Sequence, residues 1–184
     1  KWRLEQINQE LTAISIKDPL TQIYNREGMR QIAAKAFDKA AGQGRALLIM
    51  FADMDKLKYI NDTYGHEYGD KAIRSAARAI AGGGGISSIP VRYGGDEFVI
   101  IYFNKQNSEI CDIMELLRRE ISMISLPDSN PDGKSYITLS QGCLNKVPNP
   151  ANRIWDFLAW ADKTLYEVKR NGKDNFHLKD SFKN

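Results

Sequence analysis

The feature that most constrains the fold is a short, continuously apolar run within the segment RALLIMFAD at residues 45–53. Every position from 46 to 52 is apolar, so the segment has no polar face to turn toward water. A run of this length without alternation is typical of a central strand that is buried on both faces. Because such a strand must be covered on both sides, the sequence predicts an α/β domain with helices flanking a sheet.

Amphipathic stretches supply the expected helices, and shorter β-type stretches supply the other strands. A helix over 26–41 has Met29, Ile32, Ala33, Ala36, Phe37 and Ala40 on its apolar face, and Gly42 and Gly44 end it. After a polar loop, a second helix has Ile73, Ala76, Ala77 and Ile80 on its apolar face. Further helices are expected over 108–125, with Ser108 as its cap, and from about 152 to 171. Strands are expected up to 93, over 97–103, over 135–144 and over 175–178.

Length and composition exclude several classes of protein. The 184 residues fit one domain with a short extension, and a net charge of +3 does not favour a nucleic-acid or membrane-surface partner. Cys111 and Cys143 fit neither a metal motif nor a disulfide framework, which favours a reducing, cytoplasmic compartment. The sequence contains neither a signal peptide nor an apolar run long enough to cross a bilayer. Because the chain begins at Lys1, we expect a piece of a longer protein.

Residues 1–17 are expected to form an N-terminal helix that is separate from the domain at 18–184. Leu4, Ile7, Leu11 and Ile14 follow heptad spacing over about two heptads, and Asp18-Pro19 breaks the pattern. The helix either lies on its own domain or ends a signalling helix that arrives from an upstream module.

Two carboxylates, Asp53 and Asp55, follow the apolar run. Residues two apart in an extended chain face the same way, so the pair is expected to share one side. Divalent cations neutralise such pairs, and Mg²⁺ is commonly held by one or two carboxylates together with substrate phosphates. The alternative is that both acids are solvated where the strand leaves the core.

A dense polar cluster comes next, formed by Lys58, Asn61, Asp62, His66 and Asp70. Lys58 can pair with a phosphate, and Asn61 with Asp70 offers the donors and acceptors that read a purine edge. The ordinary alternatives are a surface lysine for Lys58 and a turn at Asn61-Asp62. We expect His66 to form structural hydrogen bonds rather than to bind a metal, because no partner histidine lies at ligand spacing.

The segment VRYGGDEFVI at 91–100 predicts a hairpin with a Gly94-Gly95 turn. A turn does not explain why Asp96 is followed at once by Glu97. In an extended chain their side chains leave on opposite faces, so both can reach the Asp53 end of the sheet only if the turn bends the chain. Asp53 and this acidic pair are therefore candidates for one cation site across neighbouring strands.

The last helix ends in a basic segment with Lys169, Arg170 and Lys173. Cations near a helix C-terminus interact favourably with the helix dipole, which accounts for them without a ligand. A phosphate-binding role is the alternative.

Together these motifs resemble the GGDEF-domain diguanylate cyclases, in the same order along the chain. DPLTQIYNR at 18–26 resembles the family's opening motif, and residues 53–70 resemble its nucleotide-binding segment. RYGGDEF at 92–98 is the signature itself, and ADKTLYEVKRNGKD at 161–174 resembles the C-terminal helix. The resemblance implies a five-stranded, mainly antiparallel sheet flanked by helices, similar to nucleotidyl cyclases and polymerase palm domains.

The resemblance also implies a reaction. Two domains, each holding one GTP, meet as a homodimer and condense two GTP into cyclic di-GMP and two pyrophosphates. The alternative is a catalytically inactive GTP-binding or dimerisation module. The domain is expected to be the cytoplasmic output domain of a larger signalling protein, which is itself either soluble or a membrane-bound sensor, with an upstream regulatory domain as partner. This segment is expected to contact neither nucleic acid nor a membrane.

The resemblance further implies a role for each site residue. Mg²⁺, with Mn²⁺ as the alternative, is expected on Asp53, the carbonyl of Met54, Asp96 and Glu97. Asp96 and Glu97 are the expected catalytic residues, and Asp96 helps to deprotonate the attacking hydroxyl. Substrate binding is expected from Lys58, Asn61, Asp70, Gly94, Gly95, Lys169 and Lys173, with the lysines on phosphates and the Asn61–Asp70 pair on guanine. Backbone N–H groups at 55–58 are expected to bind the β- and γ-phosphates.

The chain departs from the family pattern at three places. Gln22 replaces the family's usual glycine, and we expect little effect from this change. Lys173 replaces an arginine, so a bidentate phosphate contact becomes a contact with a point charge. The common inhibitory motif, Arg-x-x-Asp, is replaced at 85–88 by Gly-Ile-Ser-Ser. Product inhibition through that motif is therefore expected to be absent.

Overall fold

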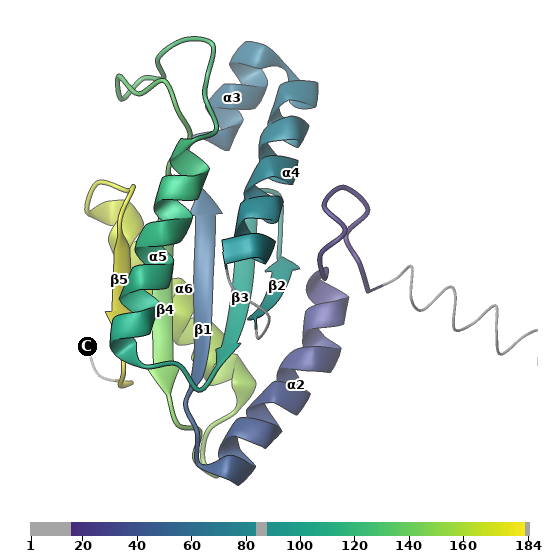
Figure 1. Ribbon diagram of the computed structural model, residues 1–184, viewed down its shortest axis with the longest axis vertical. Helices are drawn as coiled ribbons and strands as arrows, with labels where there is room; N and C mark the ends of the chain where they lie inside the picture. The colour runs from purple at the N-terminus through teal and green to yellow at the C-terminus, as the bar shows by residue number, and fades with distance from the viewer. Residues whose placement is uncertain (1–15, 84–87, 183–184) are drawn as a thin grey trace, which may run out of the picture.

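A five-stranded sheet forms the middle of the structure, a computed structural model that describes residues 16–83 and 88–182 (Figure 1). Its strand order is β2-β3-β1-β4-β5. The pairs β2–β3, β3–β1 and β1–β4 are antiparallel and β4–β5 is parallel, which confirms the predicted, mainly antiparallel sheet. The strands are β1 (Leu47–Met54), β2 (Ser88–Arg92), β3 (Glu97–Phe103), β4 (Leu139–Lys146) and β5 (Phe176–Lys179).

The apolar run forms the central strand, as predicted. All eight residues of β1 are buried, and the strand pairs with β3 on one side and β4 on the other. Its side chains alternate between two cores, with Leu48 and Met50 in one and Ile49 and Phe51 in the other. The strand therefore ends inside the molecule, and its last residues meet both neighbouring strands.

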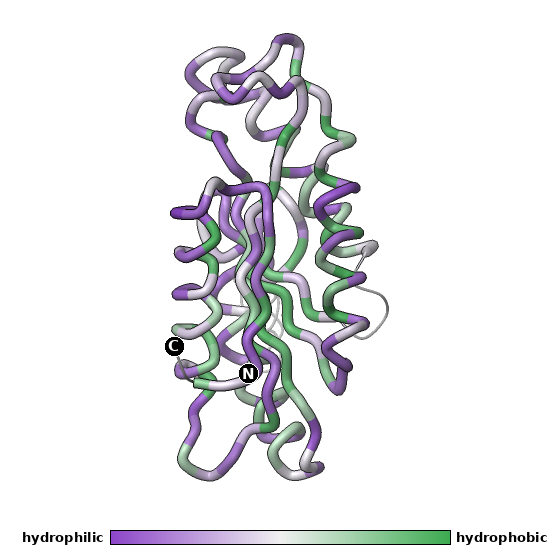
Figure 2. Tube along the Cα trace, turned by 90° about the vertical axis from the view of Figure 1, so that its left-hand side faces the viewer, coloured by the Kyte–Doolittle hydropathy of each residue, from purple (hydrophilic) through white to green (hydrophobic). Residues whose placement is uncertain are grey.

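Helices cover both faces of the sheet, and Figure 2 shows the strands as a middle layer between them. One core lies beneath α2 and α6, and the other lies beneath α3, α4 and α5. The helices are α2 (Arg26–Gln43), α3 (Leu57–Tyr64), α4 (His66–Gly83), α5 (Asn107–Ser122) and α6 (Ile154–Arg170). The predicted α2 and α6 are confirmed, with ends at Gly44 and at Asn171-Gly172. Gly42, which was expected to help end α2, lies inside the helix.

Two local predictions were wrong. The segment predicted as a polar loop after β1 contains α3, which buries Leu57 and Ile60 and leaves most of its other side chains partly or fully exposed. Eight residues are too few for periodicity to distinguish such a helix from a polar loop. The cap of α5 is Gln106 rather than Ser108, and the Glu109 carboxylate accepts a hydrogen bond of 2.8 Å from the Gln106 N–H.

Close packing of α6 on the sheet depends on Gly142 in β4. A Cβ atom at this position would lie 2.0 Å from the backbone nitrogen of Leu165 and 2.6 Å from the carbonyl oxygen of Ala161. Because these neighbours are backbone atoms, they cannot move aside as a flexible side chain can. The bare glycine thus brings α6, and the basic segment at its end, directly onto the sheet.

Gln22 is held in a conformation that suits the family's usual glycine. Its φ is 63°, in the left-handed region that disfavours side chains. We predict that Gln22→Gly raises the free energy of unfolding by about 0.5–1 kcal/mol, because relief of this strain exceeds the entropy cost of glycine. Urea unfolding measures the change. Gln22→Ala is the control, because it loses the hydrogen bond from Gln22 Nε2 to the Pro19 carbonyl but keeps a side chain at the strained φ. An equal rise in the free energy of unfolding in both variants would contradict the prediction.

Two sequence predictions fall outside the described residues. Of the predicted 1–17 helix, only Ile16 and Lys17 are described, and of the 85–88 window, only Ser88. Within the described ranges, no helix is long and apolar enough to cross a bilayer.

Candidate active site

The predicted acidic residues meet where β1 ends. Asp53 and Glu97 lie directly opposite each other in the β1–β3 register, so their side chains share the face that is covered by α6. Asp96 sits in the turn before β3, and its carbonyl oxygen accepts a hydrogen bond of 3.1 Å from the Met54 N–H. The bend in this turn lets both acids of the signature line one cleft with Asp53, as the sequence predicted.

The cleft has a volume of about 620 Å³ and is enclosed by the end of β1, the start of α3, the signature turn and the end of α6. Four acidic and four basic side chains line it, together with apolar and aromatic ones. They are Asp53, Met54, Lys56, Leu57, Lys58, Tyr59, Asp62, Asp96, Glu97, Lys169 and Lys173. Seven of the predicted site residues are therefore brought together.

Asp53 is the most buried charge of the cleft, with 7% of its surface exposed. Burial raises the pKa of its carboxyl group to about 6, although the hydrogen bond from Lys169 acts in the opposite direction. The negative charge of Asp96 raises the pKa further, which shows that the two carboxylates interact. The Lys169 Nζ atom lies 2.7 Å from Asp53 Oδ2. Asp53 is thus a buried carboxylate whose pKa stays raised despite its ion pair with Lys169.

A divalent cation fits this donor set. Asp53, Asp96 and Glu97 are hard oxygen donors on one wall of the cleft, and a cation there would offset the burial of Asp53. Among the residues the structure describes, no three acidic, histidine or cysteine side chains are gathered closely enough to hold a metal unaided.

Asp55 faces the same side as Asp53, as the sequence predicted, because its partner Ser140 lies opposite Asp53 in the β1–β4 register. It does not line the cleft, however. The chain leaves the extended conformation at Lys56, whose φ is 66°. Asp55 is 3% exposed, and its carboxylate accepts hydrogen bonds from the hydroxyls of Thr138 (2.8 Å) and Ser140 (2.9 Å). It therefore belongs to the packing between β1 and β4, and the first acid of the pair remains the candidate metal ligand.

The start of α3 forms the basic wall of the cleft. Lys56 occupies the N-cap without a side-chain cap, and backbone N–H groups in the first turn of a helix have no partner within the helix. Lys58 lines the cleft from this turn, and Lys56 pairs with Asp132 at 3.3 Å. Backbone N–H groups of a first helical turn beside two lysines suit an anionic group.

The candidate base-reading residues lie beside the cleft rather than on its lining. Asn61 is on α3 and Asp70 is on α4, and their helices pack together. Gly69 explains the close approach, because a Cβ atom there would lie 1.8 Å from Asn61 Oδ1. The Asn61 amide thus packs on the α4 turn that carries Asp70.

Gly94 and Gly95 complete the hairpin without the positive φ that a tight Gly-Gly turn uses. A Cβ at Gly95 would meet no atom within 4 Å, so this part of the turn is open. At Gly94 a Cβ would approach only the flexible end of Glu97. The two glycines keep the turn uncovered rather than shaping its backbone.

A supporting contact that the sequence reasoning did not identify joins the signature turn to the chain's opening motif. The Arg92 guanidinium donates to both carboxylate oxygens of Asp18 (3.1 and 3.2 Å) and to the Gly95 carbonyl (3.0 and 3.3 Å). Burial raises the pKa of Asp18, but hydrogen bonds from Thr21 and Arg92 outweigh burial and leave the pKa below its usual value. The sequence shows only that Arg92 lies next to the signature. Its partner Asp18 could not be inferred, because it lies 74 residues away in the chain.

The fold and the cleft define an α/β domain in which acidic and basic side chains share one cleft at the end of the central strand. Residues 15–175 match the family "Diguanylate cyclase, GGDEF domain", and the chain belongs to this family of diguanylate cyclase enzymes. It is 30% identical over 162 residues to the diguanylate cyclase DosC of Escherichia coli and 31% identical over 169 residues to DgcN of the same organism. These matches cover 88% and 91% of this chain but 34% and 40% of the two relatives, so the chain spans well under half of their length.

Solved structures agree with this family. The coiled coil and GGDEF domain of DgcB from Caulobacter crescentus, in complex with c-di-GMP, has a TM-score of 0.85 at 27% identity and covers 96% of this chain and 92% of that one. An active GGEEF domain of a diguanylate cyclase from Vibrio cholerae has a TM-score of 0.75 at 25% identity, covering 87% of this chain and 100% of that one. The predicted palm-like cyclase fold is thereby confirmed.

Proposed function

We propose that the domain condenses two GTP into cyclic di-GMP and two pyrophosphates, as a homodimer and as the output domain of a larger signalling protein. One observation carries the proposal. Asp53 and Glu97 face each other across β1 and β3 in a cleft that also contains Asp96, Lys58, Lys169 and Lys173. Phosphoryl transfer needs little from a protein beyond positioning and charge neutralisation, and this cleft offers both.

We assign Mg²⁺ to Asp53, Asp96, Glu97 and the carbonyl of Met54, because these groups offer the oxygen donors that the ion prefers. These residues would hold the ion, which would supply positive charge to offset the charge of the phosphate oxygens. Lys58 and Lys173 are assigned to phosphate oxygens, and Lys169 is shared between Asp53 and the phosphates. The N–H groups at the start of α3 bind the terminal phosphates.

The side chains of Asn61 and Asp70 are assigned to the guanine edge. A carboxylate accepts hydrogen bonds from guanine N1–H and the 2-amino group, whereas adenine lacks this donor pair. The arrangement therefore favours GTP over ATP. Because Asp70 lies on α4, this helix then contributes to the selection of the nucleotide base.

The reaction requires a second domain. The 3′-oxygen of one GTP forms a bond to the α-phosphorus of the other, the bond from that phosphorus to the β-phosphate oxygen breaks, and pyrophosphate leaves. Asp96 takes up the proton of the attacking hydroxyl. One cleft holds one nucleotide, so two copies of the domain supply the two halves of the reaction.

The test is product identification with the purified chain, GTP and Mg²⁺ over a range of protein concentrations. We expect cyclic di-GMP, a specific activity that rises with protein concentration, and loss of product in Asp96→Ala. A chain that binds GTP but yields no cyclic di-GMP at any concentration would instead be a catalytically inactive module. Product that persists in Asp96→Ala would contradict the assignment of the signature acids.

A further inference from the structure

The turn after α6 has an unusual backbone. Gly172, Lys173 and Asp174 have φ values of 111°, 63° and 44° in succession. For residues with a side chain this region costs roughly 1–2 kcal/mol each, and it persists only where surrounding contacts determine the conformation. The strained turn places Lys173 on the lining of the cleft.

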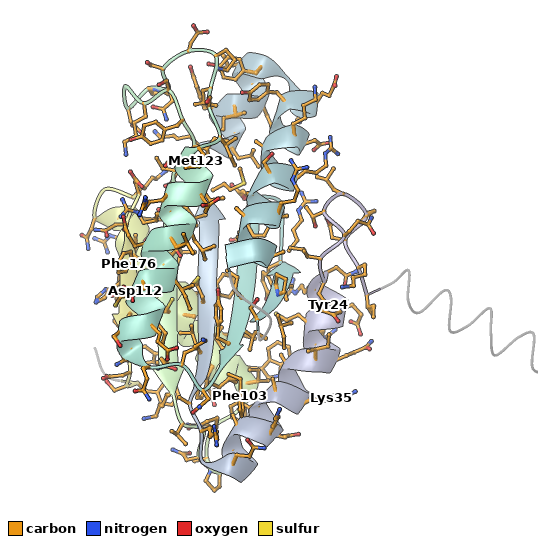
Figure 3. The ribbon with its side chains drawn as sticks, in the orientation of Figure 1. Tyr24, Lys35, Phe103, Asp112, Met123 and Phe176 are labelled. Carbon is orange, nitrogen blue, oxygen red and sulfur yellow. The ribbon has the colours of Figure 1, made fainter. Side chains whose placement is uncertain are left out.

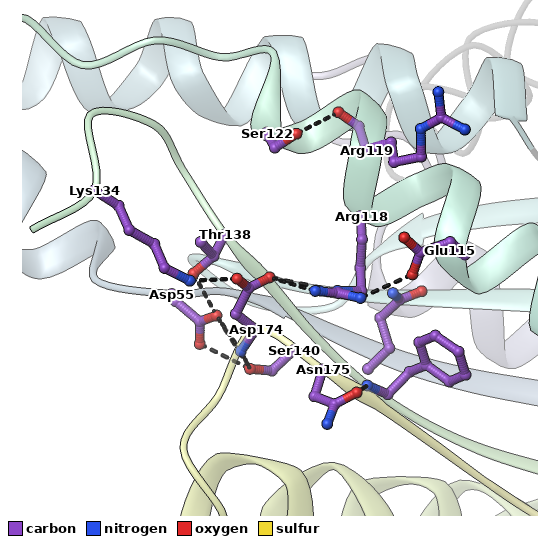
Figure 4. A network of polar contacts seen from close by, with 12 residues as sticks. Asp55, Glu115, Arg118, Arg119, Ser122, Lys134, Thr138, Ser140, Asp174 and Asn175 are labelled. Atoms are coloured by element: carbon purple, nitrogen blue, oxygen red, sulfur yellow. Dashed lines mark hydrogen bonds and ion pairs between the residues drawn. The ribbon is translucent and has the colours of Figure 1, made fainter. Parts of the chain in front are cut away.

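The backbone of this turn is anchored to the buried carboxylate next to the cleft. The Asp174 N–H donates to Asp55 Oδ2 and to Ser140 Oγ, each at 3.2 Å, as Figure 4 shows. Asp55 in turn is fixed by the hydroxyls of Thr138 and Ser140. Asp53, the candidate metal ligand, and Asp55, which anchors the turn at residues 172–174, are thus only two residues apart in the chain.

The side chain of Asp174 is held separately by two cations. Arg118 on α5 donates to Asp174 Oδ1 through two nitrogens, at 3.3 and 3.2 Å, and Lys134 donates to Oδ2 (Figure 4). The hydrogen bond to Asp174 raises the pKa of Lys134 above its usual value. The Asp174 side chain is 23% exposed, so these pairs are shielded from solvent more than ordinary surface pairs.

We propose that Asp174, anchored by Asp55, is a positioning residue that holds Lys173 in its strained conformation so that the ammonium group faces the substrate phosphates. The inference rests on the proposed function, in which Lys173 binds phosphate. The positive φ of Lys173 has a reason if its side chain must point into the cleft. A connection between α6 and β5 with an unstrained backbone would not keep Lys173 on the cleft lining. Arg118 and Lys134 act through Asp174 by fixing its carboxylate.

A double-mutant cycle on GTP binding tests this role. Asp174→Asn keeps the size of the side chain and tolerates the left-handed backbone, while it removes the charge that Arg118 and Lys134 hold. We expect Asp174→Asn and Lys173→Ala each to raise the Kd for GTP with Mg²⁺ by about 5–20-fold. The double variant is expected to match Lys173→Ala alone, because Asp174 has nothing left to position. Isothermal titration calorimetry gives the three values.

The matched control is Glu115→Gln. Glu115 also pairs with Arg118, at 2.8 Å, and lies on the same helix, but it does not contact Asp174 in any hydrogen bond or ion pair among the described residues. It should bind GTP like the wild type. If Asp174→Asn does not fold, Lys134→Met replaces it in the cycle, with a smaller effect expected in the same direction.

The outcomes separate this inference from the proposed function. Additive effects in the double variant, or wild-type affinity in Asp174→Asn, would show that the network is only structural. Wild-type protein that binds GTP without forming cyclic di-GMP would contradict the cyclase proposal, and the binding cycle would still decide the role of Asp174. Wild-type protein that does not bind GTP at all would overturn both.

Discussion

Replacing Asp53 with asparagine is expected to lower the rate of cyclic di-GMP formation by a factor of about 10³ or more, and at the same time to stabilise the metal-free domain. The activity falls because an amide cannot supply the negative charge that a divalent cation needs from this wall of the cleft. The stability rises because the wild-type carboxylate is buried, 7% exposed, and close to Asp96. Product formation and thermal unfolding without metal measure the two effects.

The stability effect has a defined pH dependence. The pKa of Asp53 is raised from 3.8 to about 6, so the folded domain binds this proton more tightly than the unfolded chain does. The free energy of unfolding of the metal-free wild type therefore falls as the pH rises from about 4 to about 6. At pH 7 the raised pKa corresponds to about 3 kcal/mol. Asp53→Asn also deprives Lys169 of its partner, so we expect a net gain of about 1–2 kcal/mol, or roughly 3–6 °C in Tm.

The control for this prediction is Asp112→Asn, which makes the same change of charge on an exposed position of α5 (Figure 3). It should leave both activity and Tm close to those of the wild type. A stability difference between Asp53→Asn and wild type that is equally large at pH 4 and pH 7 would contradict the burial argument. Added Mg²⁺ should stabilise the wild type more than Asp53→Asn.

Replacing Gly69 with alanine is expected to lower the affinity for GTP by about 10–100-fold, although alanine is the better helix residue. The added methyl group would lie 1.8 Å from Asn61 Oδ1, so the amide must leave the position in which it packs against α4. The proposed guanine contacts of Asn61 and Asp70 then no longer act together. Calorimetric titration with GTP, and with ATP for comparison, measures both affinity and selectivity.

The same helix provides a matched control. Gly82 also lies in α4, and a Cβ atom there would meet nothing within 4 Å. Gly82→Ala should therefore bind GTP like the wild type and be slightly more stable. If Gly69→Ala keeps wild-type affinity for GTP, then Asn61 does not read the base from its present position.

Local patterns in the sequence were sufficient for most of the framework. The unbroken apolar run predicted a central strand, and β1 is buried along its whole length. Apolar stripes predicted α2 and α6, and Asn171-Gly172 marked the end of α6, because periodicity and terminating residues are properties of a few adjacent residues. The signature hairpin followed from the same kind of local signal.

Short elements and the partners of single side chains were harder to predict from the sequence. Helix α3 was predicted as a loop because its eight residues are too few for periodicity to distinguish a short helix from a polar loop. Asp55 shares the side of Asp53, as expected, but its hydrogen-bond partners Thr138 and Ser140 could not be predicted because they lie more than 80 residues away in the chain.

The sequence by itself determined which chemical groups the domain has: an acidic pair in a hairpin, an aspartate at the end of a buried strand, and lysines at the end of a helix. The tertiary structure decided which of them act together. Strand register places Glu97 opposite Asp53, and the close packing at Gly142 brings α6 and Lys169 onto the same carboxylate. The strained conformation of Lys173 likewise depends on Asp55, Arg118 and Lys134, from three distant segments of the chain. Such contacts join residues far apart in the chain, and burial and register exist only once the chain has folded.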